Sequence, residues 1–131
     1  MNLRLFAFAF VSLAIGCSSS SGAAPDAPVI DDLEVPAMTT TLTVNGQTGP
    51  GVVLTLTAHD SSAGINALHV VFTENSVDQP MSIPGSPTMI SRQPIELVVL
   101  GAPSGQHTIA FHVTNLNGAS SNVVTKTITV P

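Results

Sequence analysis

A strict alternation of apolar and polar residues in three stretches constrains the fold more than any other feature of the chain. In residues 52–59, the even positions hold valine, leucine and alanine, while threonine and histidine occupy most of the odd ones. The same two-residue period recurs in residues 68–73 and 108–114. Because successive strand residues point to opposite sides of a sheet, each stretch is predicted to be a strand with one buried and one wetter face.

Further short runs rich in Val, Ile, Leu and Thr follow residue 29, separated by Gly, Pro, Asn and Asp, and no segment shows a convincing 3.6-residue period. This spacing predicts an all-β chain of about seven strands in two packed antiparallel sheets. The expected strands are residues 29–35, 39–44, 52–59, 67–73, 94–100, 107–115 and 123–130. In the last strand Lys126 shares the inward phase of its apolar neighbours, which predicts either a bulge near Thr125 or a lysine stem lying along the sheet edge.

The segment between Glu74 and Gln93 breaks this pattern, because it contains three closely spaced prolines. Proline cannot donate to a sheet ladder, so we expect only short edge strands or loop here, crossing between the two sheets. Within residues 78–92, four apolar residues could form a surface for a protein partner: Met81, Ile83, Met89 and Ile90. The alternative is that they close the open side of the sandwich.

The first residues have the form of an export signal. Arg4 precedes an apolar run from Leu5 to Ile15, and Gly16 and Cys17 follow it. The run is too short to cross a bilayer, which requires about 20 apolar residues in a helix. We therefore predict a helical signal segment, a flexible Ser/Ala/Pro linker that starts at the cysteine, and the sandwich, at residues 1–16, 17–28 and 29–131.

The sequence Ala14-Ile15-Gly16-Cys17 resembles the lipobox of bacterial lipoproteins. The resemblance implies that Cys17 is diacylated, with palmitate or a similar fatty acid, and becomes the first residue of a mature chain held in the cell envelope by its lipid. Ser18 stands where an aspartate would favour inner-membrane retention, which implies outer-membrane sorting. The alternative is an ordinary secretory leader cut near Gly16 or Ala23-Ala24, with Cys17 unmodified.

The region after the linker resembles bacterial immunoglobulin-like domains of the group that includes PKD-type, cadherin-like and fibronectin-III-like modules. The resemblance is carried by residues 53–60, 105–118 and 121–130, and it implies an immunoglobulin-like sandwich. Members of this group share a fold more than a function. Gly105-Gln106-His107 stands where the family has glycine-x-tyrosine, so His107 could replace a corner tyrosine whose hydroxyl ties back to the backbone.

Two places hold candidate metal ligands. His69 and His112 lie on outward phases of strands that are neighbours in the immunoglobulin arrangement, so their imidazoles could begin a zinc or copper site, although no third ligand is identified. The alternative is two surface histidines on a Thr-rich face. Asp60 begins a loop where some relatives bind calcium, but one carboxylate is far from the set of about six to eight oxygens that calcium takes. A turn capped by the Asp60 side chain is therefore the favoured interpretation.

Composition excludes several function classes. Three basic residues face eight acidic ones, with a formal net charge of −5, so no nucleic-acid partner is expected. After the leader there is no Trp or Tyr, and Phe72 and Phe111 lie on inward phases, so no ring is available to stack on a carbohydrate. No spacing of Ser, His and Asp suggests a nucleophile, so neither catalysis nor a cofactor is expected.

These observations leave two hypotheses for function. The leading one is a membrane-anchored extracytoplasmic lipoprotein whose sandwich is a structural, adhesive or protein-interaction module. The alternative is a ligand-binding lipoprotein that uses His69 and His112 for a metal or residues 78–92 for an envelope protein.

Overall fold

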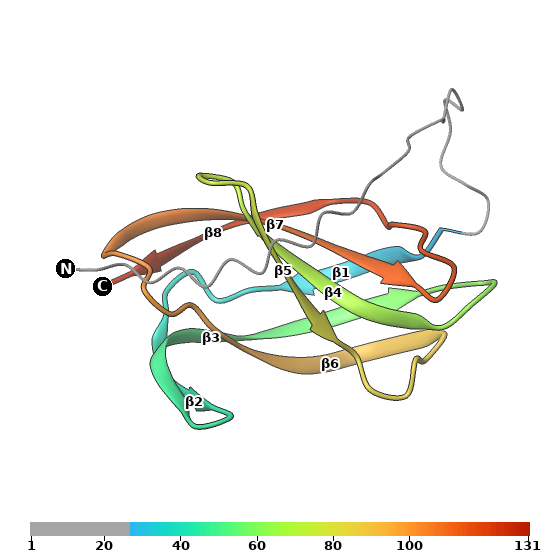
Figure 1. Ribbon diagram of the computed structural model, residues 1–131, viewed down its shortest axis with the longest axis horizontal. Helices are drawn as coiled ribbons and strands as arrows, with labels where there is room; N and C mark the ends of the chain where they lie inside the picture. The colour runs from blue at the N-terminus through green and yellow to red at the C-terminus, as the bar shows by residue number, and fades with distance from the viewer. Residues whose placement is uncertain (1–26) are drawn as a thin grey trace.

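The computed structural model describes residues 27–131, which form eight β-strands joined by loops (Figure 1). The strands are β1 (Val29–Glu34), β2 (Thr40–Val44), β3 (Gln47–His59), β4 (Ile65–Phe72), β5 (Val77–Ser82), β6 (Met89–Val98), β7 (Gly105–Asn115) and β8 (Val124–Val130). They form two antiparallel sheets, one of β1, β2, β3 and β6, the other in the order β5-β4-β7-β8. The predicted all-β, immunoglobulin-like sandwich is confirmed. The signal segment, Cys17 and most of the predicted linker lie outside the described residues.

Strand β3 organises the first sheet. Its first residues pair with β2 across a hairpin turn at Asn45-Gly46, where both residues have positive φ, 52° and 77°. This Asn-Gly pair suits a two-residue hairpin, because asparagine and glycine tolerate the left-handed backbone that the turn requires. The later residues of β3 pair with β1 and with β6, so the most regular alternating stretch in the sequence lies inside its sheet.

The predicted inward phases form the core. The predicted inward side chains of β3 are at most 2% exposed: Val52, Leu54, Leu56 and Ala58. The predicted inward side chains of the other two strands are fully buried: Leu68 and Val70 of β4, and Ile109, Phe111 and Val113 of β7. Phe72, at the end of β4, is partly buried and packs against this cluster. The two-residue period was sufficient to predict these positions, because each sheet has one face against the other sheet.

Strand β5 is a short edge strand of the kind expected in the segment that contains Pro80, although it was not among the seven predicted strands. Strand β6 differs from the prediction, because it begins at Met89 rather than at Pro94. Within β6 the register shifts, and Arg92 has a φ of +46°, so a bulge interrupts the alternation. Both strands are sheet edges, where proline is tolerated, and residues 83–88 cross from one sheet to the other as expected.

Strand β8 pairs with β7 without a register shift, so the bulge considered near Thr125 is absent. Lys126 is half-buried and lines a surface depression with Leu33 and Glu34 of β1. This position supports the other alternative, in which the lysine stem lies along the sheet edge.

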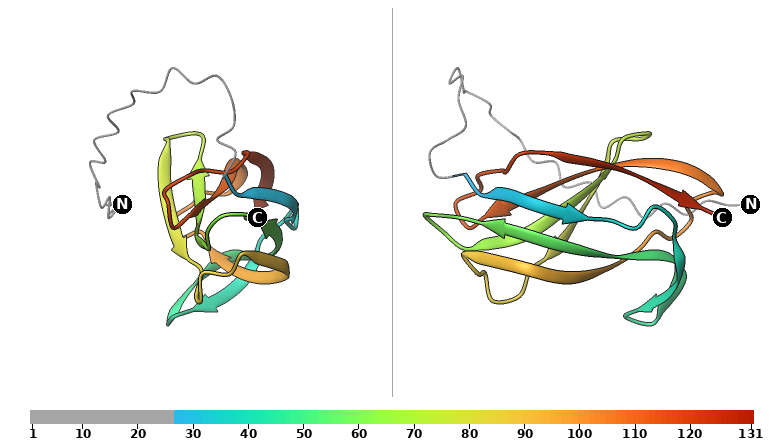
Figure 2. Two further views of the ribbon diagram at one scale, coloured as in Figure 1. Left: turned by 90° about the vertical axis from the view of Figure 1, so that its right-hand side faces the viewer. Right: turned by 180° about the vertical axis from the view of Figure 1, so that it is seen from behind.

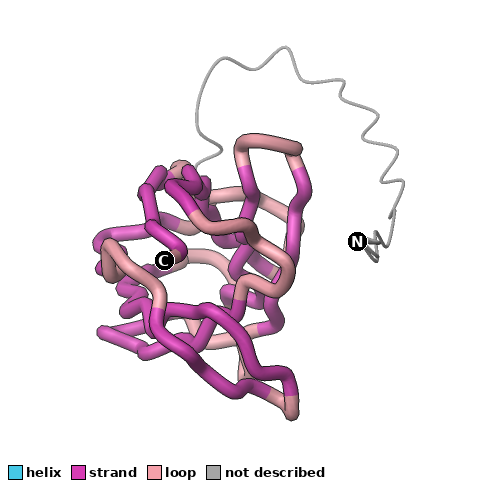
Figure 3. The backbone as a smooth tube through the Cα atoms, turned by 90° about the vertical axis from the view of Figure 1, so that its left-hand side faces the viewer, coloured by secondary structure: helices cyan, strands magenta, loops and turns pink. Residues whose placement is uncertain are grey.

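The two long sides of the sandwich are closed differently. On one side, Thr39 donates its amide to the Thr129 carbonyl and the Thr129 amide donates to Ala37, which joins the β1–β2 connection to β8. On the other side lie the edge strands β5 and β6, where Met81 and Ile95 pack against the core. Figure 3 shows that strands and the loops that join them make up the described backbone. The first residues of β1 and the terminal Pro131 lie at opposite ends of the long axis (Figures 1 and 2).

Candidate functional site

A pair of stacked histidines lies on the outer face of the second sheet. The antiparallel register of β4 and β7 sets His69 directly opposite His112. Their ring centroids are 4.5 Å apart and the ring planes are inclined by 9°. The structure therefore brings together the two histidines that the sequence placed on one outward face.

A carboxylate that the sequence analysis missed joins this pair. Asp78 of β5 lies with its Oδ2 atom 2.9 Å and its Oδ1 atom 3.1 Å from Nδ1 of His69. One ligand atom from each of His69, Asp78 and His112 lies within 4.8 Å of the others. The sequence held only a weak signal for this carboxylate. If residues 77–82 form a strand, Val77 and Met81 point to the inner face, so Asp78 points to the outer face.

Two further side chains orient His69. The Thr114 hydroxyl donates to Oδ1 of Asn66 at 3.2 Å, so its oxygen accepts the hydrogen bond from Nε2 of His69, also at 3.2 Å. A hydroxyl has one proton to donate, so this arrangement places a proton on Nε2. Nδ1 is then the His69 nitrogen that faces Asp78, where a proton or a metal ion can lie between them.

The electrostatics of His112 favour its neutral form. Burial, and then the neighbouring His69, hold the pKa of His112 below its usual value, although Asp78 opposes them. The ring therefore keeps a nitrogen lone pair at neutral pH, which is the form of imidazole that binds metals.

Asp60 caps a loop. Its Oδ1 accepts the amides of Ser62 and Ala63 at 2.8 and 3.0 Å, and its Oδ2 accepts the side-chain amide of buried Asn115 at 2.7 Å. Burial alone would raise the pKa of Asp60, but the hydrogen bonds from Ala63, Ser62 and Asn115 together outweigh burial and lower it. Both carboxylate oxygens are engaged inside the protein, which fits the predicted capped turn.

His107 forms the corner that the family resemblance implied. Its Nε2 donates to the Pro103 carbonyl at 2.7 Å, the backbone tie that a corner tyrosine would make. Its Nδ1 lies 2.9 Å from the Glu74 carboxylate, a partner the sequence did not indicate. The bond to Pro103 and then the bond to Glu74 raise the pKa of His107, despite the opposing effect of burial.

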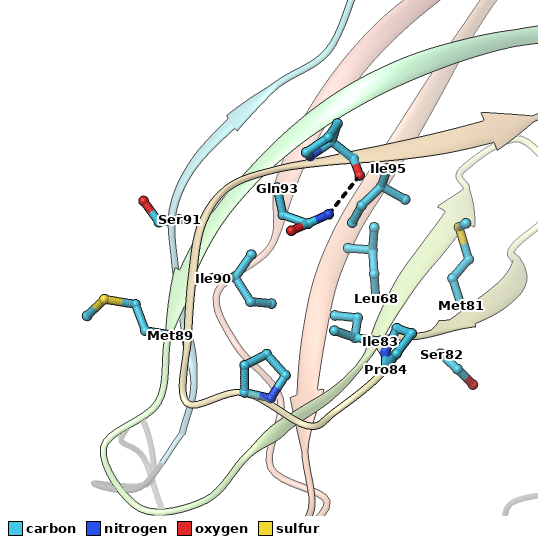
Figure 4. Close-up of a pocket in the computed structure, with 12 residues that line it drawn as sticks. Leu68, Met81, Ser82, Ile83, Pro84, Met89, Ile90, Ser91, Gln93 and Ile95 are labelled. Carbon is cyan, nitrogen blue, oxygen red and sulfur yellow. Dashed lines mark hydrogen bonds between the residues drawn. The ribbon is translucent and has the colours of Figure 1, made fainter.

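The four apolar residues of residues 78–92 line a groove of about 450 Å³ between β5 and β6 (Figure 4). Ile90 is 4% exposed and belongs to the core, while Met81 and Ile83 are partly buried against it. Met89 differs from them, because it is 70% exposed. Three of the four therefore close the open side of the sandwich, and only Met89 presents most of its surface to solvent.

Two other pairs of interacting side chains lie on the exposed surface. His59 of β3 binds Asp31 at 2.7 Å, and Arg92 of β6 forms a two-pronged pair with Glu34. Within the described residues, neither pair belongs to a group of three side chains that could hold a metal ion. Residues 27–131 also contain no helix able to cross a bilayer.

The described residues thus define an immunoglobulin-like sandwich of two antiparallel sheets. Comparison with solved structures finds the PKD domain of an M14-like peptidase from Thermoplasmatales archaeon SCGC AB-540-F20, with a TM-score of 0.54 and 12% identity over 82% of this chain and 99% of that one. The PKD1 domain of Vibrio anguillarum Epp was also found, at a TM-score of 0.43 and 22% identity over 80% and 96%. At this identity the archaeal likeness shows the fold alone.

Two comparisons by sequence found no match. No protein-family model matches the chain, and no curated protein matches it. The fold is therefore established by the strand arrangement and the structural likeness, and function has to be argued from the residues.

Proposed function

We propose that the chain is a lipid-anchored envelope lipoprotein whose sandwich acts as a structural or adhesive module without catalysis. The observation that carries the proposal is the direction of the chain through the sandwich. The chain enters β1 at one end of the long axis, and Pro131 lies at the other end (Figures 1 and 2). A module attached through its N-terminal side would project its opposite end away from the point of attachment.

The surface of residues 27–131 supports a module of this kind. The polar groups of Asp60 and His107 are used in internal hydrogen bonds, and the pocket that His107 lines with Glu74 holds no Ser, Thr or Cys. The shared fold with a domain described as the PKD domain of a peptidase also supports a modular role. The lipobox-like sequence before Cys17 supports the anchor, because two or more acyl chains hold a protein firmly, at about 0.8 kcal/mol for each buried CH₂.

Intact mass spectrometry of the envelope fraction tests the anchor. We expect a mature chain that starts at Cys17 and carries the added mass of its acyl groups. A Cys17→Ser variant, the matched control, should be neither acylated nor cut before residue 17. A free thiol on Cys17 in the wild-type chain, or a leader cut at another position, would refute the proposal.

A second candidate function is recognition of an envelope protein at the groove between β5 and β6. It is favoured by the exposed side chain of Met89, which lines the same groove as the partly buried Met81. Pull-down from envelope extracts should recover a partner with the wild type that the double variant Met81→Ala/Met89→Ala loses. Leu116→Ala provides the control, because Leu116 is also exposed, at 61%, and does not line the groove. If none of the three chains retains a partner, the groove only closes the sandwich.

A further inference from the structure

The stacked histidines and Asp78 have the composition of a transition-metal site. Two imidazoles and one carboxylate form a common three-residue ligand set for zinc, which leaves a fourth position open for water or an external ligand. The three residues come from three adjacent strands, β7, β4 and β5. Their backbone positions are therefore held by the hydrogen-bonded sheet rather than by a loop.

The distances are close to those that a bound ion requires. With ligand bonds of about 2.0 Å, the ligand atoms of a tetrahedral site lie roughly 3.3 Å apart. Nδ1 of His69 and Oδ2 of Asp78 are already 2.9 Å apart, and no ligand atom of the set is more than 4.8 Å from another. Asp78 is exposed and His112 is half-buried. Binding requires the His112 ring to turn out of its parallel stack with His69, so that its nitrogen points at the same ion as Nδ1 of His69.

The hydrogen bonds around His69 have the pattern found behind metal-bound histidines. A metal-binding imidazole usually donates its other N–H to a protein acceptor, which sets the tautomer and orients the ring. Here Nε2 of His69 donates to Thr114, and Thr114 donates in turn to Asn66. These bonds direct Nδ1 toward Asp78, so Thr114 is a positioning residue and not a ligand.

We propose that His69, Asp78 and His112 bind one divalent transition-metal ion, with zinc as the fitting case, on the outer face of the second sheet. His69 binds through Nδ1, and the ion takes the place of the proton between that nitrogen and Asp78. The site adds a binding function to the module and does not depend on whether Cys17 carries lipid.

Isothermal titration of the full chain with zinc chloride, in detergent micelles and metal-free buffer, tests the proposal. We expect one zinc ion per chain, and at least tenfold weaker binding in both His112→Ala and Asp78→Asn. The matched control is His59→Ala. It also removes a histidine that is paired with a carboxylate, Asp31, but this pair has no second imidazole beside it. This variant should bind zinc like the wild type. Absence of zinc binding in the wild type, or an equal loss in His59→Ala, would overturn the site.

Two further measurements separate binding from folding. On addition of zinc, the imidazole ¹⁵N resonances of His69 and His112 in the wild-type chain should move, while those of His59 and His107 should not. Thr114→Val removes only the hydroxyl that orients His69 and should weaken zinc binding by about tenfold while leaving the stoichiometry at one. Equal movement of the ¹⁵N resonances of all four histidines would contradict the proposed geometry. Zinc affinity that is unchanged in both single variants, Thr114→Val and Asp78→Asn, would contradict it as well.

Discussion

The buried pair of Asp60 and Asn115 has a direction that a residue swap can test. Asp60 supplies only acceptors: Oδ1 takes two loop amides, and Oδ2 takes the Asn115 side-chain amide at 2.7 Å. Asn115 uses its own oxygen to accept the amides of Asn117 and Ala119. Its amide group is therefore held toward Asp60 and cannot turn without losing those two bonds.

Each single substitution should break this pair. Asp60→Asn sets two NH₂ groups against each other, and Asn115→Asp sets two carboxylates against each other in a buried site. A hydrogen bond to a charged group contributes roughly 1.5–3 kcal/mol, and its buried partner is also left unsatisfied. We therefore expect each single variant to lower the free energy of unfolding by about 2–3 kcal/mol.

The double variant Asp60→Asn/Asn115→Asp restores one donor against one acceptor, with the direction reversed and the net charge unchanged. If the two losses were independent, the free energy of unfolding of the double variant would fall by about 5 kcal/mol. We expect a fall of about 2 kcal/mol, because the double variant again sets a donor against an acceptor. Urea denaturation of the four chains at neutral pH measures the coupling. Losses that add to within about 0.5 kcal/mol would refute the proposed pairing.

Three other predictions concern stability. His107→Gln should cost more stability at about pH 6 than at about pH 9 in urea titrations. The pKa of His107 is raised in the folded state, so its stabilising effect is complete below the unfolded pKa and is lost as pH rises through the folded pKa. A loss of stability that does not change with pH would contradict this prediction. Gly64→Ala should lower the unfolding free energy by about 1–3 kcal/mol, because a Cβ there would lie 2.2 Å from the Ser86 carbonyl oxygen; an unchanged melting temperature would disprove that contact. Leu54→Ala should cost about 2–5 kcal/mol in thermal unfolding, whereas Val53→Ala, on the outer face of the same strand, should cost far less.

Much of the candidate site follows from local pattern once the fold class is known. The outward phases of His69 and His112 could be read from the alternation of their strands, and the immunoglobulin arrangement made those strands neighbours. Asp78 could not be placed in this way, because it lies in a segment whose prolines and missing period concealed strand β5. The partner of His107 was missed for a different reason, because Glu74 lies 33 residues away in the chain.

The sequence by itself determined the fold class and the core, because the two-residue period of β3, β4 and β7 is a local property that needs no partner to be visible. It also determined the lipobox-like segment and the likeness of His107 to a corner residue. Only the tertiary structure decided which side chains meet across strands. Register brought Asp78 to His69, turned Asn115 toward Asp60, and buried Ile90 while leaving Met89 exposed. Those contacts depend on how strands far apart in the chain align, and no short stretch of residues encodes that alignment.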